Sequence, residues 1–292
     1  MFGNVLTAMV TPFDDQLNVN YPAAVRLAQY LAANGTDSIV VAGTTGETPT
    51  LTKDEKLTLF KEVKQAVGDN CKVIAGVGTY STKETITLMQ KIDFKLDGIM
   101  AVVPYYNKPS QQGLYEHFRA IAESTDLPVM LYNIPARTGV NLLPETVVKL
   151  AEIPNILCLK EAAGSMDQVS ELKCSLPSSF TIYCGDDSLT LPMLALGCSG
   201  VVSVASHIVG KQIKQMIESY FKGDFNKSLE LHLKLYPIFK GIFVTSNPVP
   251  IKFLLNEMGL NVGGYRPPLV GPTPKEQDFL RNLLKTFNCF QQ

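Results

Sequence analysis

A short apolar segment followed by residues at helical spacing recurs along most of the chain. Each apolar segment is rich in β-branched residues and is apolar at consecutive positions rather than at alternate ones. Strands of a parallel sheet have this pattern, because helices cover both faces of the sheet and neither face meets water. The strands that we expect are Val5–Val10, Ser38–Ala42, Lys72–Val77, Gly98–Val103, Pro128–Tyr132, Ile156–Lys160, Thr181–Cys184 and Gly200–Val204.

Eight such segments in a chain of 292 residues favour an α/β fold of the closed (β/α)8 barrel type. A barrel of this kind takes about 250 residues, which leaves room for an addition. The competing architecture is a doubly wound open sheet, whose dinucleotide-binding form needs a glycine-rich turn after its first strand. Thr11–Asp15 is no such turn, and Gly76–Ser81 resembles one only in part, because it ends on serine and lacks a ribose-binding acid.

After Val204 the pattern changes to helices alone. We therefore predict a catalytic barrel over residues 1–224 and a helical C-terminal extension over residues 225–292. The helices that we expect in the barrel include Ala23–Ala33, Lys53–Val67 and one that starts near Thr82, and those that follow the last strand are Ile208–Phe221, Phe225–Ser246, Pro250–Met258 and, beyond Pro267–Pro274, Lys275–Phe287.

The net charge is −1 and 18% of the residues are charged. This balance provides no electrostatic attraction to nucleic acid or to an anionic membrane. No secretion signal is visible at the N-terminus, and no segment approaches the ~18 uninterrupted apolar residues of a membrane helix. We expect a cytosolic protein without a nucleic-acid or membrane partner. The cysteines form no CxxC pair, and we expect small reduced core residues at Cys71, Cys158, Cys174, Cys184, Cys198 and Cys289.

The sixth expected strand ends on a lysine, Lys160. A chain seldom points a strongly hydrated ammonium group along a buried strand without a use for it. A desolvated, neutral amine at the mouth of a strand can attack a ketone and form a Schiff base, which turns the substrate into an electron sink. The same stretch equally fits a strand whose last residue is simply the first one in solvent.

Barrel enzymes carry their sites on the carboxyl ends of the strands and on the loops that follow. Thr44 and Thr45 lie between glycines after the second strand, where backbone N–H groups and hydroxyls can hold a carboxylate, although such a sequence also fits a plain turn. Tyr105 and Tyr106 follow the fourth strand in a proline-bounded loop. These tyrosines fit either catalysis or packing at an interface.

The fifth strand ends on Tyr132, and Arg137 lies in the loop beyond it. A guanidinium group binds carboxylates through a fork of donors, although a lone loop arginine also fits a surface salt bridge. No phosphate-binding loop, nucleophile elbow or Cys/His pair is present, which leaves Lys160 as the candidate for covalent catalysis without a cofactor. We expect no metal site, because the histidines are far apart, on helix surfaces or partly packed: His117, His207 and His232.

Three motifs, Gly43–Glu47, Tyr132–Gly139 and Lys160-Glu161, occur together in this order. In them the chain resembles, over nearly its whole length, the Lys-dependent (β/α)8 pyruvate aldolases, a family that contains the dihydrodipicolinate synthases and the N-acetylneuraminate lyases. Thr44-Thr45, Tyr106 and Arg137-Thr138-Gly139 are similar to the synthase branch. The sialic-acid lyases look different, with serine before threonine in the first motif and no arginine at the position of Arg137.

The resemblance implies a condensation of pyruvate with L-aspartate 4-semialdehyde that gives 4-hydroxy-tetrahydrodipicolinate, on the route to diaminopimelate and lysine. It further implies at least a homodimer, and a homotetramer built as a pair of dimers, since Tyr106 in this family reaches into a neighbouring subunit. The resemblance implies that Lys160 forms an imine with pyruvate and that Thr44, Tyr132 and Tyr106 relay protons. It implies that Thr45 binds the pyruvate carboxylate and Arg137 the semialdehyde carboxylate. Gly185 and Val202 would line the pyruvate pocket.

Lysine inhibits many but not all members of the family, at a cleft beside the active site. Sensitive members typically carry histidine at the positions of Lys53 and Lys56 and asparagine at that of Tyr80. Like charges about 4 Å apart repel by about 4 kcal/mol at an effective dielectric near 20, so we expect weak or absent inhibition by lysine. The residues of this effector cleft, by resemblance, are Thr48, Pro49, Lys53, Lys56, Tyr80, Glu84 and Tyr105.

Two other functions remain open. A related pyruvate-dependent aldolase that acts on a sugar-derived aldehyde would keep Lys160 and Tyr132. A non-catalytic barrel that serves as a binding or structural module would need neither, and the presence of both together with Thr44 and Tyr106 argues against it.

Overall fold

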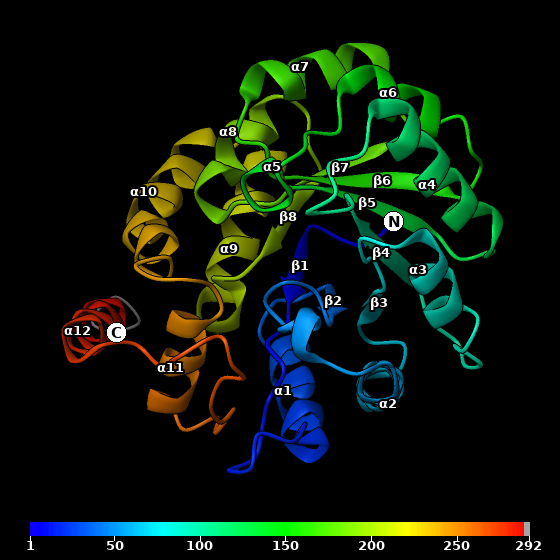
Figure 1. Cartoon of the computed structure of the whole chain (residues 1–292). Helices are drawn as coiled ribbons and strands as arrows, with labels where there is room; N and C mark the ends of the chain where they lie inside the picture. The colour runs from blue at the N-terminus through cyan, green and yellow to red at the C-terminus, as the bar shows by residue number, and fades with distance from the viewer. Residues whose placement is uncertain (289–292) are drawn as a thin grey trace.

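Eight parallel strands close into a barrel in the computed structural model, which describes residues 1–288 (Figure 1). Each strand pairs with the next one along the chain, and β1 also pairs with β8, which closes the ring. The barrel fold predicted from the sequence is therefore confirmed. The strands are β1 (Val5–Ala8), β2 (Ser38–Val41), β3 (Lys72–Gly76), β4 (Gly98–Val102), β5 (Val129–Asn133), β6 (Ile156–Glu161), β7 (Thr181–Cys184) and β8 (Gly200–Ser203).

The helices that follow these strands surround the barrel, and three further helices lie together at one side of it (Figure 1). Those around the barrel are α1 (Tyr21–Ala33), α2 (Lys53–Val67), α3 (Thr82–Met89), α4 (Gln111–Glu123), α5 (Pro135–Thr138), α6 (Pro144–Leu150), α7 (Met166–Ser175), α8 (Thr190–Ala195) and α9 (Ser206–Phe221). Those at the side are α10 (Phe225–Gly241), α11 (Val249–Glu257) and α12 (Pro274–Asn288).

Local sequence signals explain where helix α2 begins and ends. The Thr52 hydroxyl accepts a hydrogen bond from the backbone N–H of Glu55, and the Glu55 carboxylate accepts one from the N–H of Thr52. This reciprocal cap satisfies two N–H groups that the first turn leaves without helical partners. Gly68 ends the helix at a φ of 56°, a conformation that favours glycine.

Two layers of apolar side chains build the core. The layer inside the barrel includes Leu6, Val40, Ile74 and Met130, and Phe2 is buried with it. A larger layer fills the space between the strands and the surrounding helices. Since both faces of every strand are covered, the strands read as continuous apolar runs rather than alternating ones.

Several strands are shorter than expected because the chain leaves the ladder where the loops begin. Ala42, for example, takes a φ of 53°, which ends β2 after Val41. Helix α10 ends at Gly241 rather than Ser246, and the N–H groups of Phe243 and Val244 bond the carbonyls of Lys240 and Gly241 in tighter turns. Among residues 1–288, no helix has the length and apolar character needed to cross a membrane.

The histidines and one cysteine differ from expectation. All three histidines are buried, whereas we expected helix-surface or partly packed positions. The Nδ1 of His207 bonds the carbonyl of Val204, and its Nε2 accepts from the N–H of Val10, so the ring ties two segments of the core together. Cys174 is exposed, because it lies near the end of α7 on the face turned away from the core. The expected core residues Cys71, Cys158, Cys184 and Cys198 are buried and free, and Cys289 lies outside the described residues.

Candidate active site

Lys160 and Tyr132 meet at the carboxyl ends of neighbouring strands. The register of β5 and β6 places the two residues side by side, and the Lys160 ammonium nitrogen lies 4.1 Å from the centre of the Tyr132 ring. Lys160 is 6% exposed and Tyr132 is 3% exposed. The lysine is therefore not the first residue in solvent after a strand, because the barrel buries it against an aromatic face.

Gly185 lies against the stem of Lys160, and Val202 lies in the barrel interior. A Cβ atom at Gly185 would lie 3.2 Å from Cε of Lys160 and 2.6 Å from Cβ of Ala162, so any side chain there would press on the lysine stem. Val202 is buried inside the barrel on β8. The absence of a side chain at Gly185 therefore leaves the stem of Lys160 uncrowded.

The Gly43–Glu47 turn brings two hydroxyls to the same end of the barrel. Thr44 lines a small cavity of about 20 Å³ together with Tyr132, Met100 and Val102. Thr45 is buried, and its hydroxyl oxygen accepts a hydrogen bond of 2.9 Å from the side-chain amide of Asn247. A residue of the C-terminal segment thus fixes a predicted substrate-binding hydroxyl.

A buried ion pair anchors the same turn to the C-terminal helices. The carboxylate of Glu47 lies 2.8 Å from the ammonium group of Lys252 on α11, and both side chains are fully buried. Lys252 also donates to the carbonyl of Thr11, and Glu47 accepts from the backbone N–H of Arg266. Burial lowers the pKa of Lys252, and the charge of Glu47 opposes that effect. Removing one partner would leave an uncompensated buried charge.

A second polar network holds the end of β6. The buried Glu161 carboxylate accepts hydrogen bonds from the side-chain amides of Asn133 and Gln168 and from the N–H of Ala163. Burial raises the pKa of Glu161, and these donors oppose the rise because they bond the ionised form. The network fixes the strand end that carries Lys160.

Two predicted site residues are not brought to Lys160 within one chain. Arg137 lies on the short helix α5 with an exposed side chain. Tyr106 is 93% exposed and has a φ of 73°, unusual for a tyrosine. Among residues 1–288, no group of three or more His, Cys, Asp or Glu side chains is placed to hold a metal ion.

Residues 1–287 match the sequence model of the Dihydrodipicolinate synthetase family. The chain belongs to this family. A 4-hydroxy-tetrahydrodipicolinate synthase from Desulforamulus reducens is 57% identical over 98% of both chains.

Solved structures of family members agree with the fold. A dihydrodipicolinate synthase from Cyanidioschyzon merolae, determined with lysine bound, is 47% identical with a TM-score of 0.96 over 98% of both chains. A synthase variant described as monomeric is 40% identical with a TM-score of 0.95, over 98% of this chain and 97% of the other.

The residues assigned to the effector cleft by family resemblance lie together in the structure. A cavity of about 180 Å³ is lined by Thr48, Pro49, Lys56, Tyr80, Glu84 and Tyr105, along with Leu51, Gly78 and Thr79. Lys53 forms an ion pair with Glu84 at this cavity. The rings of Tyr80 and Tyr105 meet edge to face with their centres 5.4 Å apart.

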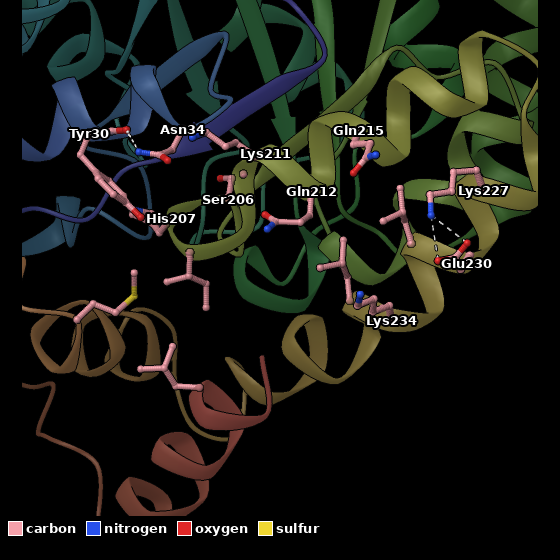
Figure 2. A pocket seen from close by; sticks show the side chains of 16 residues that line it. Tyr30, Asn34, Ser206, His207, Lys211, Gln212, Gln215, Lys227, Glu230 and Lys234 are labelled. Atoms are coloured by element: carbon pink, nitrogen blue, oxygen red, sulfur yellow. Dashed lines mark hydrogen bonds and ion pairs between the residues drawn. The ribbon is translucent and has the colours of Figure 1, made fainter. Parts of the chain in front are cut away.

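A larger cavity, of about 580 Å³, lies between α1, α9 and α10 (Figure 2). None of the predicted site residues lines it. Several of its polar groups bond within the chain: Lys227 pairs with Glu230, and the Asn34 amide donates to the carbonyl of Tyr30 (Figure 2). Of the predicted catalytic residues, Thr44 and Tyr132 line the cavity of about 20 Å³ instead.

Sequence reasoning missed Asn247, Lys252 and Arg266. Asn247 lies 202 residues from Thr45, and Lys252 lies 205 residues from Glu47, so no local pattern links the partners. Lys252 looks like an ordinary helical lysine in the sequence. The only local signal was the acidic end of the first motif, Glu47, which needed a buried partner once its turn was placed inside the fold.

Proposed function

We propose that the chain condenses pyruvate with L-aspartate 4-semialdehyde through a Schiff base on Lys160. It is an enzyme, a Schiff-base-forming lyase of the 4-hydroxy-tetrahydrodipicolinate synthase type, in diaminopimelate and lysine biosynthesis. The family match and the relative at 57% identity support this activity. The relatives compared above give no support to the alternative of a sugar-derived aldehyde.

In the first step, the amine of Lys160 attacks the ketone carbon of pyruvate, and water leaves as the C=N bond forms. Thr45 holds the pyruvate carboxylate together with backbone of the Gly43–Gly46 turn. Thr44, Tyr132 and a Tyr106 from a second subunit carry protons. The phenol of a tyrosine has a pKa near 10 in water, so a chain of hydrogen bonds rather than a free phenolate passes the proton.

In the second step, loss of a proton from the pyruvate methyl group gives an enamine that attacks the aldehyde carbon, and the aldehyde oxygen becomes the 4-hydroxyl group. The amine of the semialdehyde then attacks the imine carbon, the ring closes, and Lys160 is released. Arg137 binds the carboxylate of the semialdehyde through paired donors. Gly185 and Val202 line the pocket of the pyruvate part.

The observation that carries this proposal is the buried contact between Lys160 and Tyr132 at adjacent strand ends. The test is the mass of the protein after incubation with pyruvate and borohydride. We expect one reduced pyruvyl group per chain on Lys160, and none in Lys160→Arg, because a guanidinium group cannot form the imine. A label on another lysine would overturn the assignment.

The same proposal includes a homodimer that completes each site, and a homotetramer built from two dimers. Support comes from Tyr106, whose nearly complete exposure leaves it free to reach a neighbouring chain. Helix α10 further exposes a row of large apolar side chains at helical spacing, Phe225, Leu229, Leu233 and Tyr236, as expected of a surface that meets another protein. A cytosolic location stays a prediction.

A further inference from the structure

The segment between β5 and α6 carries Arg137 and has little stability of its own. Its helix α5 spans four residues and ends at Gly139, which takes a φ of 75°. So short a helix is not stable by itself in water, because too few hydrogen bonds offset the ordering of its backbone. Among residues 1–288, no acceptor bonds the exposed Arg137 guanidinium group. The place of Arg137 therefore depends on what holds the two ends of the segment.

Asn133, the last residue of β5, closes this segment into a loop. Its side-chain nitrogen donates a 2.8 Å hydrogen bond to the side-chain oxygen of Asn141. Its side-chain oxygen accepts a 3.0 Å bond from the backbone N–H of Leu142. Asn133 is fully buried, so neither bond competes with water. The two bonds join the strand end to the chain that returns eight and nine residues later.

The Asn141 side chain also bonds a residue of α7, which closes a ring of side chains. Its nitrogen donates a 2.7 Å bond to the side-chain oxygen of Gln168, and the Gln168 nitrogen donates a 3.1 Å bond to the Glu161 carboxylate. That carboxylate also accepts a 3.1 Å bond from the Asn133 nitrogen. A polar ring is thus formed by Asn133, Asn141, Gln168 and Glu161.

The polar ring fixes the direction of each amide in it. An ionised Glu161 only accepts hydrogen bonds, so the amides of Asn133 and Gln168 must turn their nitrogens toward it. The Gln168 oxygen is then left to accept from the Asn141 nitrogen, and the Asn141 oxygen to accept from Asn133. From α4, the Gln111 amide adds a 2.8 Å bond to the backbone carbonyl of Asn141. A fully satisfied polar network of this kind holds its members rigidly.

We propose that Asn141 is a positioning residue for the second substrate, because through the polar ring it holds Arg137 where the guanidinium group meets the carboxylate of the semialdehyde. This inference rests on the role proposed above for Arg137. Lys160 precedes Glu161 on β6, and neighbouring residues of a strand point to opposite faces. The polar ring therefore lies on the other face of the strand from the amine that forms the imine. Asn141 serves the semialdehyde step and not the pyruvate step.

The test compares three variants of the full-length enzyme. Asn141→Ala breaks the polar ring at the returning chain, and Gln168→Ala breaks it at α7, which keeps the test available if the first variant fails to fold. Asn155→Ala is the matched control, because its amide bonds the carbonyls of Ala122 and Thr125 and no member of the polar ring. The measurements are kcat/KM for the semialdehyde and the rate at which borohydride-trapped pyruvate imine forms.

We expect kcat/KM for the semialdehyde to fall about tenfold in Asn141→Ala and severalfold in Gln168→Ala, because a loosened segment presents Arg137 correctly only part of the time. Imine formation should stay within about twofold of the parent in both, and Asn155→Ala should keep both values. In an Arg137→Ala background, Asn141→Ala should change kcat/KM by less than about twofold, since a residue that acts through another has no separate effect once that other is removed.

Trypsin cleaves after arginine, so it reports the freedom of this segment without any substrate. Cleavage between Arg137 and Thr138 should be faster in Asn141→Ala than in the parent or in Asn155→Ala, as seen in the masses of the two fragments. If Arg137→Ala lowers kcat/KM and Asn141→Ala does not, or if the effect of Asn141→Ala persists in full without Arg137, the positioning role is overturned. Normal semialdehyde kinetics in Arg137→Ala would instead contradict the substrate role of Arg137, and this inference would be overturned with it.

Discussion

The side-chain amide of Asn247 donates a 2.9 Å hydrogen bond to the hydroxyl oxygen of Thr45. Since this lone pair is occupied, the hydroxyl proton of Thr45 stays available to the pyruvate carboxylate that we propose it binds. Asn247 thus acts as a positioning residue, and it comes from the segment between α10 and α11 rather than from the barrel strands.

Replacement of Asn247 should impair the pyruvate step selectively. In Asn247→Asp the new carboxylate accepts the Thr45 proton and repels the substrate carboxylate, so the KM for pyruvate should rise about ten- to a hundredfold. Asn247→Ala should lose about 1 kcal/mol of binding free energy and raise the KM for pyruvate roughly fivefold. The measurement is the rate at which borohydride-trapped imine forms as the pyruvate concentration is varied. The KM for the semialdehyde should be nearly unchanged. A normal pyruvate KM in Asn247→Asp would disprove this positioning role.

Arg137→Ala should weaken use of the semialdehyde and spare the imine. Loss of a charged hydrogen bond costs roughly 1.5–3 kcal/mol, or about ten- to a hundredfold in kcat/KM for aspartate 4-semialdehyde. Steady-state rates against semialdehyde, beside the trapped imine, separate the two steps. Arg119→Ala is the control, because that exposed arginine pairs with Glu116 on α4 far from the strand ends. If Arg137→Ala slowed imine formation by the same factor, Arg137 would have a role other than binding the semialdehyde.

Mixing two inactive variants should restore activity if Tyr106 completes the site of a neighbour. Tyr106→Phe lacks the phenol and Lys160→Ala lacks the amine, but a mixed dimer holds one complete site. After random exchange, up to about a quarter of the parental specific activity should return. Each variant incubated alone is the control. Verified exchange without recovered activity would show that the site is not shared.

Free lysine should inhibit weakly or not at all. Glu84, the acid that would receive an ammonium group, is already paired with Lys53, and Lys56 adds a second cation to the cleft. The measurement is the initial rate against added L-lysine at fixed pyruvate. Replacement of Lys53 and Lys56 by histidine and of Tyr80 by asparagine should increase inhibition. Half-inhibition of the parent at submillimolar lysine would contradict the expectation.

Acidification should destabilise the fold through His207. Burial lowers its pKa to about 4, whereas an unfolded histidine titrates near 6.5. The unfolded chain therefore binds the proton more tightly, so the contribution is complete above about pH 6.5 and is lost as the pH falls toward 4, at most about 3 kcal/mol. Buried His117 acts in the same direction, and Asp187, whose pKa burial raises to about 6, opposes it.

The comparison of parent and His207→Gln isolates that contribution. The glutamine keeps an acceptor for the N–H of Val10 but has no charge to gain. Urea unfolding at pH 7 and pH 5 should show a smaller fall in the free energy of unfolding for the variant. An equal fall in the free energy of unfolding in both proteins would show that His207 does not contribute to the pH dependence of stability.

The barrel and Lys160 could be predicted because both depend on local patterns. Continuous apolar runs identify covered strands, and a lysine at the end of such a run is conspicuous. The contacts of Asn247 and Lys252 could not be predicted, because their partners are more than 200 residues away in the sequence. Nothing in the sequence around a single asparagine or lysine indicates which distant residue it will bond. The contact expected of Tyr106 could not be checked in the structure of one chain, because it involves a second copy of the protein.

The pairing of Glu47 with Lys252 also joins an early part of the chain to a part that the ribosome makes much later. The two residues are 205 positions apart, and Arg266 follows later still. A nascent chain generally folds from its N-terminus as it emerges. When all eight strands have left the exit tunnel, the second βα loop still holds a buried acid without its cation. We therefore expect the Gly43–Glu47 turn to reach its final arrangement only after α11 has been synthesised.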